Sequence, residues 1–144
     1  MRRVWQNIYV GLAWLFLAAV ITQFFLAGLG VFGAKTFEPH KDFAGIFHLL
    51  ALLIVLLAIF ARRNRTDIIL AVVLFVIVTI QFSLPEARDD APGVAALHVV
   101  NALFIWMVGY HLAMRALVAR FRGDPLEAAP ARPPVDTLPP PPAQ

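Results

Sequence analysis

Residues 43–61 read FAGIFHLLALLIVLLAIFA, nineteen residues without one charged side chain. About twenty apolar residues are enough for a helix to span a bilayer. Residues 4–34, 68–85 and 91–114 lack charge in the same way. Charged types make up 15% of the 144 residues, against roughly 25% in a soluble domain. A chain of this length cannot bury four such stretches, so the pattern predicts an all-α, four-helix transmembrane bundle.

The predicted bundle covers residues 1–123, with spans at about 8–31, 43–61, 67–84 and 94–118. Only helices and closed barrels satisfy the backbone in lipid, and four spans are too few for a barrel. These features exclude a soluble enzyme and a DNA-binding domain. No cysteine is present, so thiolate ligands and c-type haem attachment are excluded as well. The sequence shows no clear internal repeat, although two helical hairpins of similar size leave a duplication open.

The basic residues predict the orientation of the bundle. They gather at the start of the chain, between spans two and three, and after span four, whereas segments 35–42 and 86–90 are mixed or acidic. Positive loops stay inside, which places both termini in the cytoplasm. The net charge of +3 therefore marks topology and predicts no nucleic-acid partner. The first apolar run is too long for a signal peptide and is expected to remain uncleaved.

The last 21 residues, 124–144, hold eight of the eleven prolines. Such a segment buries too little apolar surface to fold and prefers extended, solvated conformations. We expect a disordered cytoplasmic tail. Recognition of this tail by a proline-binding partner is the alternative.

A layer of polar residues crosses the predicted outer half of the bundle. Its members are Gln23, His40, His48, Gln81, His98 and Asn101. Polar residues within spans usually face the bundle interior and often mark function. The layer is therefore a candidate binding site. The alternative is that these side chains only join the helices by hydrogen bonds.

The histidines suggest one haem site. Neutral imidazoles are axial ligands of haem iron. Counted from the inner arginines at ~1.5 Å per residue, either His40 or His48 matches the depth of His98. His111 lies 13 residues after His98, but span two offers no second histidine at that spacing, so two stacked haems are not supported. We interpret His111 as an inner-interface residue.

Two family resemblances extend this interpretation. The stretch QFFLAGLGVFG at 23–33, with His40, Gln81 and the pair His98 and Asn101, resembles a family of small, uncharacterised bacterial four-span membrane proteins. That resemblance covers residues 1–120. It implies a multi-pass protein of the bacterial inner membrane, and it implies no activity.

The second resemblance is to one four-helix half of haem A synthase. It rests on Glu38-Pro39-His40-Lys41 followed by Gly45, on Gln81, and on Leu97-His98-Val99. The resemblance implies that His40 and His98 are axial ligands of a haem near the outer face. This chain is similar to one half only, lacks the family's cysteine pair, has Lys41 in place of an arginine, and differs by one residue in the Glu-to-His spacing. The oxidative chemistry of the synthase is therefore not implied.

These observations predict that the chain binds one haem b through two histidines, for electron transfer or haem handling. Lys41 and Arg88 are expected at the haem propionates, and a membrane redox partner or further subunits are implied. The alternative is a non-catalytic accessory protein whose polar layer only fixes helix packing. A proton or substrate carrier is disfavoured because no Asp or Glu lies in a span core. No catalytic residue is predicted.

Overall fold

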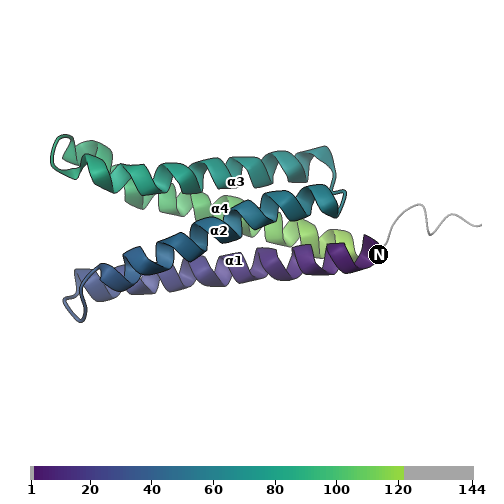
Figure 1. Ribbon diagram of the computed structural model, residues 1–144, viewed down its shortest axis with the longest axis horizontal. Coiled ribbons are helices and arrows are strands. Elements are labelled where there is room, and N and C mark those ends of the chain that lie inside the picture. Colours follow the sequence, from purple (N-terminus) through teal and green to yellow (C-terminus); the bar gives the residue numbers. More distant parts are fainter. Residues whose placement is uncertain (1, 122–144) are drawn as a thin grey trace, which may run out of the picture.

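The computed structural model describes residues 2–121, which form four long helices (Figure 1). The elements are α1 (Arg2–Val31), α2 (Glu38–Phe60), α3 (Arg65–Ser83), a short 3-10 helix η1 (Leu84–Arg88), and α4 (Pro92–Phe121). The predicted all-α, four-helix bundle is confirmed. The predicted tail, residues 124–144, lies outside the described residues.

Local sequence explains where the helices begin and end. α1 is followed by Gly33, which has a φ of 71° that glycine adopts without strain. Asn64 caps α3, since its side-chain oxygen accepts a hydrogen bond from the backbone N–H of Asp67 at 2.9 Å. α2 begins five residues before the predicted span, with Pro39 in its first turn, where a missing N–H is tolerated. His40 therefore belongs to the helix and not to the loop before it.

The helices run alternately up and down, and each packs against two neighbours. α1 and α3 both contact α2 and α4, so α2 and α4 face each other diagonally across the bundle. We call the end that holds residues 32–37 and 84–91 the turn end; it is on the left in Figure 1. The opposite end holds the α2–α3 turn, the start of α1 and the end of α4, and we call it the basic end.

The buried positions of the first two helices recur 58 residues later. On α2 and α4 they are Phe47 and Ile105, Ala51 and Gly109, Ile54 and Leu112, and Ala58 and Ala116. On α1 and α3 they are Tyr9 and Asp67, Ala13 and Ala71, Phe16 and Leu74, and Val20 and Val78. The α1–α2 and α3–α4 hairpins are therefore equivalent, with the contacts expected of an approximate two-fold axis along the bundle.

The surface of the bundle is that of a membrane protein. All four helices are long and apolar enough to cross a bilayer. Large apolar side chains such as Phe25, Ile59 and Leu103 are exposed on them, as expected where lipid replaces water around a bundle. The chain is thus a multi-pass membrane protein surrounded by lipid. Its orientation stays a prediction.

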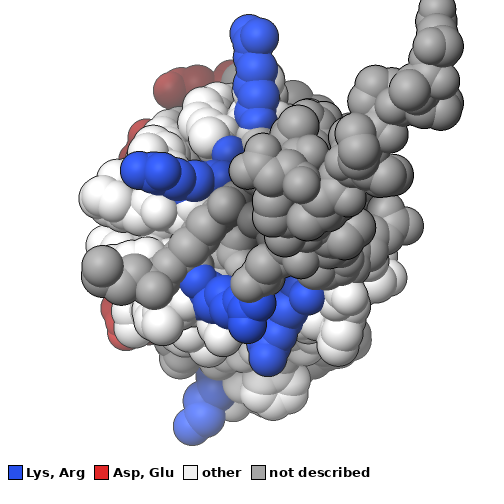
Figure 2. Space-filling view, turned by 90° about the vertical axis from the view of Figure 1, so that its right-hand side faces the viewer, with Lys and Arg blue, Asp and Glu red and all other residues white. Residues whose placement is uncertain are grey.

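Charge is distributed unequally between the two ends. Figure 2 looks onto the basic end and shows Lys and Arg side chains on its face. The described arginines of this end come from α1, from residues 62–65 and from the last turns of α4. The described acidic residues belong to segments at the turn end, with the exception of Asp67. The position of Asp67 among arginines is considered below.

Candidate functional site

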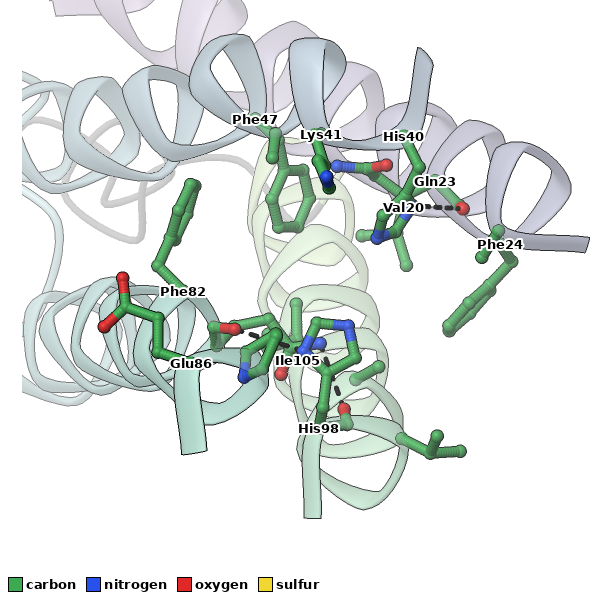
Figure 3. Close-up of a pocket in the computed structure, with 16 residues that line it drawn as sticks. Val20, Gln23, Phe24, His40, Lys41, Phe47, Phe82, Glu86, His98 and Ile105 are labelled. Carbon is green, nitrogen blue, oxygen red and sulfur yellow. Dashed lines mark hydrogen bonds between the residues drawn. The ribbon is translucent and has the colours of Figure 1, made fainter. Parts of the chain in front are cut away.

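A pocket of about 510 Å³ opens at the turn end, lined by residues of all four helices and of η1 (Figure 3). Pockets that hold cofactor-sized ligands range over roughly 300–1,000 Å³ and are mostly apolar. Small side chains at Ala27, Ala44 and Ala102 line this pocket, where larger ones would fill it. Its polar lining residues are Gln23, His40, Lys41, Gln81, Glu86 and His98. Four of the six candidate residues predicted from sequence therefore line one pocket.

His40 and His98 meet across this pocket from diagonally opposed helices. His40 is on α2 and His98 is on α4, and Figure 3 shows the two side chains extending towards each other. Their ring centroids are 6.1 Å apart, and the ring planes make an angle of 71°. His40 and His98 are themselves 58 positions apart, so the two rings occupy equivalent places in the two hairpins.

The orientation of His98 is set by a closed hydrogen-bond network. Its Nδ1 lies 3.1 Å from the backbone oxygen of Gln81. The Gln81 amide donates to the backbone oxygen of His98 at 3.0 Å and accepts from the Asn101 amide at 2.7 Å. Asn101 also donates to the backbone oxygen of Ile77 at 2.8 Å. Because a carbonyl oxygen only accepts, Nδ1 of His98 carries the proton, and Nε2 keeps its lone pair.

The same contact is repeated at His40. Its Nδ1 lies 3.2 Å from the backbone oxygen of Gln23, which precedes it by 17 residues, as Gln81 precedes His98. With its amide turned so that both ends find partners, Gln23 donates to the His40 backbone oxygen at 3.1 Å and accepts from the Ala44 N–H at 3.3 Å. The same amide nitrogen lies 2.8 Å from Nδ1. The backbone carbonyl of Gln23 favours a proton on Nδ1 of His40, whereas the side-chain amide nitrogen of Gln23 favours an unprotonated Nδ1. A ligand bound at Nε2 selects the first arrangement.

His48 and His111 lie elsewhere. His48 packs between the rings of Phe75 and Phe82, with centroid distances of 5.2 and 5.0 Å, and its Nε2 lies 3.2 Å from Thr79 Oγ1. Since Thr79 Oγ1 donates to the backbone oxygen of Phe75, it accepts from Nε2 of His48. This histidine joins α2 to α3 and does not line the pocket. His111 lines a second pocket, at the basic end.

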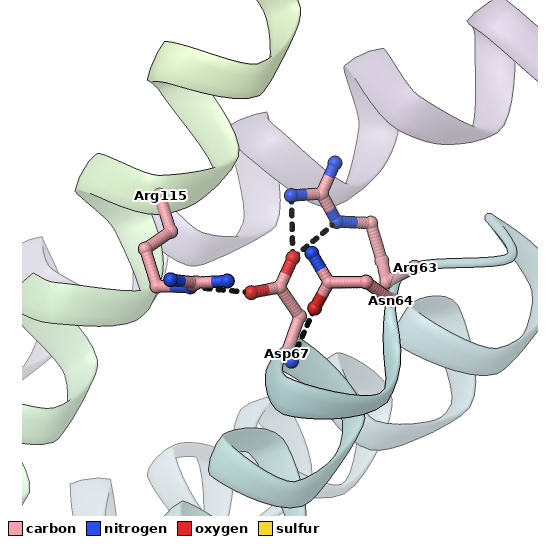
Figure 4. A network of polar contacts seen from close by, with 4 residues as sticks. All are labelled: Arg63, Asn64, Asp67 and Arg115. Atoms are coloured by element: carbon pink, nitrogen blue, oxygen red, sulfur yellow. Dashed lines mark hydrogen bonds and ion pairs between the residues drawn. The ribbon is translucent and has the colours of Figure 1, made fainter.

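A buried ionic cluster at the basic end was missed by sequence reasoning (Figure 4). The carboxylate of Asp67 is 1% exposed. Its Oδ2 accepts from Nε and Nη2 of Arg63 at 3.0 and 2.6 Å, and its Oδ1 accepts from Nε of Arg115 at 2.6 Å. The positions of the two arginines in the sequence, near the ends of spans, predict only membrane topology. The sequence does offer one signal, because Asp67 is an acidic residue in the first turn of an otherwise uncharged span. Ionisable residues within membrane spans are rare and usually functional.

The donor set limits which metals fit. Residues 2–121 contain no group of three or more His, Cys, Asp or Glu side chains placed to hold a metal ion. A bare zinc or iron ion needs at least that many protein ligands. The pair His40 and His98 suits only a metal that brings its remaining ligands with it.

Comparison with known proteins adds a partial match. No curated protein matches the chain, and neither does any solved structure. Residues 23–87 match a family of unknown function, DUF6220. The matched segment runs from the end of α1 to η1 and includes Gln23, His40, His48 and Gln81. This part of the chain is therefore similar to DUF6220, and the similarity assigns no activity.

Proposed function

We propose that the chain binds one b-type haem between His40 and His98, in the pocket at the turn end. The observation that carries this proposal is the 6.1 Å separation of the two ring centroids. An iron atom held at about 2 Å by one nitrogen of each ring would place the centroids about 6 Å apart. The separation of the two rings is therefore the one that an iron bound to both would require.

The hydrogen bonds support the same assignment. In both histidines Nδ1 contacts a backbone carbonyl oxygen of the glutamine 17 residues earlier, and Nε2 has no hydrogen-bond partner among the described residues. Histidines that bind metals usually donate their other N–H to a carbonyl or carboxylate, which fixes the ring and raises its basicity. Gln23 and Gln81 would thus orient the two ligands from α1 and α3.

The pocket rim offers one cation for a propionate. Lys41 lines the pocket and pairs with Glu38 at 3.0 Å, with both side chains about two-thirds exposed (66% and 65%). An exposed pair of this kind contributes little, so Lys41 can exchange Glu38 for a haem propionate. Arg88, the other residue predicted for this role, is not among the pocket-lining residues.

A bound haem supplies one-electron chemistry at its iron. The chain contributes orientation, through His40 and His98, and a mostly apolar lining that limits water and thereby tunes the potential. These contributions suit electron transfer or haem handling with a membrane redox partner. The resemblance to haem A synthase supports the ligand assignment. That support extends to the ligands and not to the oxidation that the enzyme performs.

The second candidate function is purely structural. The amides of Gln81 and Asn101 donate to backbone oxygens of neighbouring helices, and such bonds contribute about 0.6–2 kcal/mol each in membranes. In this reading the chain is an accessory subunit or scaffold, and the polar layer fixes its packing.

A reduced-minus-oxidised visible spectrum separates the two functions. The full chain, expressed with haem supplementation and purified in detergent, should show a b-type spectrum. His98→Ala and His40→Ala should each abolish or strongly alter it, whereas His48→Ala and His111→Ala, matched controls outside the pocket, should leave it unchanged. A colourless wild-type protein, or equal effects of all four substitutions, would reject the haem proposal in favour of the structural one.

A further inference from the structure

The basic end contains a second pocket, of about 370 Å³. Arg63, Arg115 and His111 line it, together with Asn64. Asp67 and the apolar side chains of Met114, Val118 and Ala119 complete the lining. This pocket has two arginines, which the pocket between His40 and His98 lacks, and the two pockets lie at opposite ends of the bundle. Its role is therefore independent of the proposed haem site.

The charges of this pocket do not balance. Asp67 supplies one carboxylate, and Arg63 and Arg115 supply two guanidinium groups, so the cluster carries one excess positive charge. The side chain of Arg63 is only 8% exposed, and that of Asp67 is 1% exposed. Arg63 and Asp67 balance each other, so the excess charge belongs to Arg115, which is 34% exposed and lines the pocket. The pocket is therefore net positive, and it attracts an anion.

The geometry of Arg115 indicates which kind of anion. Arg115 contacts Asp67 through Nε alone, at 2.6 Å, as Figure 4 shows. Its Nη1 and Nη2 groups have no partner among the described residues, and the side chain is 34% exposed. An arginine anchored by Nε presents its two terminal nitrogens as a fork, which matches two oxygens of a phosphate group.

A buried hydroxyl next to the cluster is also left without a partner in the described part of the chain, although it does not line the pocket. Tyr9 is fully buried, and its Oη has no hydrogen-bond partner among residues 2–121. The guanidinium carbon of Arg63 lies 5.3 Å from the centre of the Tyr9 ring. Buried hydroxyls are nearly always hydrogen-bonded, so this one is an unused donor beside an already cationic cluster.

We propose that this pocket binds the phosphate group of an anionic phospholipid. The chain is surrounded by lipid, and Arg115 lies six residues, less than two turns, before the described end of α4. This position places the fork near the level of the headgroups, where basic pockets between helices take anionic lipids. Arg63, Arg115 and His111 would contact the phosphate, while Asp67 holds the two arginines in place.

The test measures thermal unfolding of the purified full chain in dodecyl maltoside with added phosphatidylglycerol. Phosphatidylglycerol should raise the melting temperature. Arg115→Gln should require about tenfold more lipid for the same rise, because a charge-assisted fork is lost. Arg120→Gln removes the same charge from an exposed position of α4 outside the pocket and should behave as wild type.

A second variant keeps the proposal testable if Arg115→Gln does not fold. Ala119 lines the pocket but takes no part in the ion pairs, so Ala119→Trp should fill the pocket and abolish the lipid effect without removing an ionic partner. Three results would overturn the proposal: an undiminished lipid effect in Ala119→Trp, an equal effect of phosphatidylcholine, or an equal effect of inorganic phosphate at the same concentration.

Discussion

Replacing Asp67 by asparagine should destabilise the bundle more than any other single change of a charged residue described here. The substitution keeps the side chain's size and leaves the cap from Asn64 intact, since that bond uses the backbone N–H of Asp67. It removes the only carboxylate among residues 2–121 that contacts the guanidinium groups of Arg63 and Arg115. Breaking a buried pair in this way costs about 3–5 kcal/mol, which is a factor of more than a hundred in the unfolding equilibrium.

Substituting either arginine should lower the free energy of unfolding by less than Asp67→Asn does, and the two losses should differ. Arg63 gives Asp67 two hydrogen bonds and is 8% exposed, so Arg63→Gln should cost about 2–4 kcal/mol. Arg115 gives one hydrogen bond and is 34% exposed, so solvent screens its contribution, and Arg115→Gln should cost about 1 kcal/mol. Asp42→Asn, at an exposed carboxylate, is the control and should change stability by less than ~0.5 kcal/mol.

Unfolding of each variant in mixed micelles with increasing SDS, followed by tryptophan fluorescence, measures these differences. The double variant Asp67→Leu with Arg63→Met should recover most of the loss, because it removes the buried charges together, and Arg115 is exposed enough to reach water. A cost below about 1 kcal/mol for Asp67→Asn, or a double variant no more stable than Asp67→Asn, would refute the electrostatic reasoning.

Three further predictions concern packing, topology and the tail. Gly109→Ala should destabilise the bundle by about 1–3 kcal/mol in the same assay, because the new Cβ would lie 3.1 Å from the buried ring of Phe16. At Gly45 a Cβ meets no atom within 4 Å, so Gly45→Ala should be neutral or slightly stabilising. Equal effects of the two substitutions would contradict this reasoning. A reporter inserted at Arg88 should be on the outer side and one after Gln144 in the cytoplasm, and reversed accessibility of both would reject the positive-inside assignment. Deleting residues 125–144 should leave membrane insertion and melting temperature unchanged, and a clear loss of folded protein would show that this segment contributes to the bundle.

The fold was predictable because lipid restricts the possible structures so strongly. Four uncharged stretches of spanning length leave a helical bundle as the only arrangement that satisfies the backbone. Which of His40 and His48 faces His98 was harder to predict from the sequence, because counting residues gives the depth along the helix axis and not the direction around the helix. In a span that is apolar on every side, hydrophobicity does not show which face is packed.

Small residues carry that missing signal. Ala44, Ala51 and Ala58 recur every seven residues and mark the face of α2 that packs inside the bundle, as small residues do between helices in membranes. At 3.6 residues per turn, these alanines and the buried Phe47 and Ile54 all lie within about 40° of His40, whereas His48 lies about 80° away from it. The structure agrees, since His40 lines the pocket and His48 contacts α3.

Asp67 and the 58-residue repeat required the tertiary structure. Asp67 follows an arginine-rich turn by two residues, so in the sequence it resembles one more charge at a helix end. Its burial follows from the approach of Arg63 and Arg115, which are 52 residues apart in the chain. The repeat is hidden because most of its equivalent positions hold different residues, such as Phe47 and Ile105. In a bundle core, volume and position matter more than identity.

The equivalence of the two hairpins has a consequence for how this molecule could change over time. If the bundle were a dimer of two identical hairpins, every mutation would appear in both halves at once. Joining them in one polypeptide releases each half to change alone. The turn end has the matched pairs of Gln23 with His40 and Gln81 with His98, whereas the basic end has Tyr9 in one half and Asp67 in the other. The two halves are thus alike where they face a common centre and differ where a single charged cluster lies to one side.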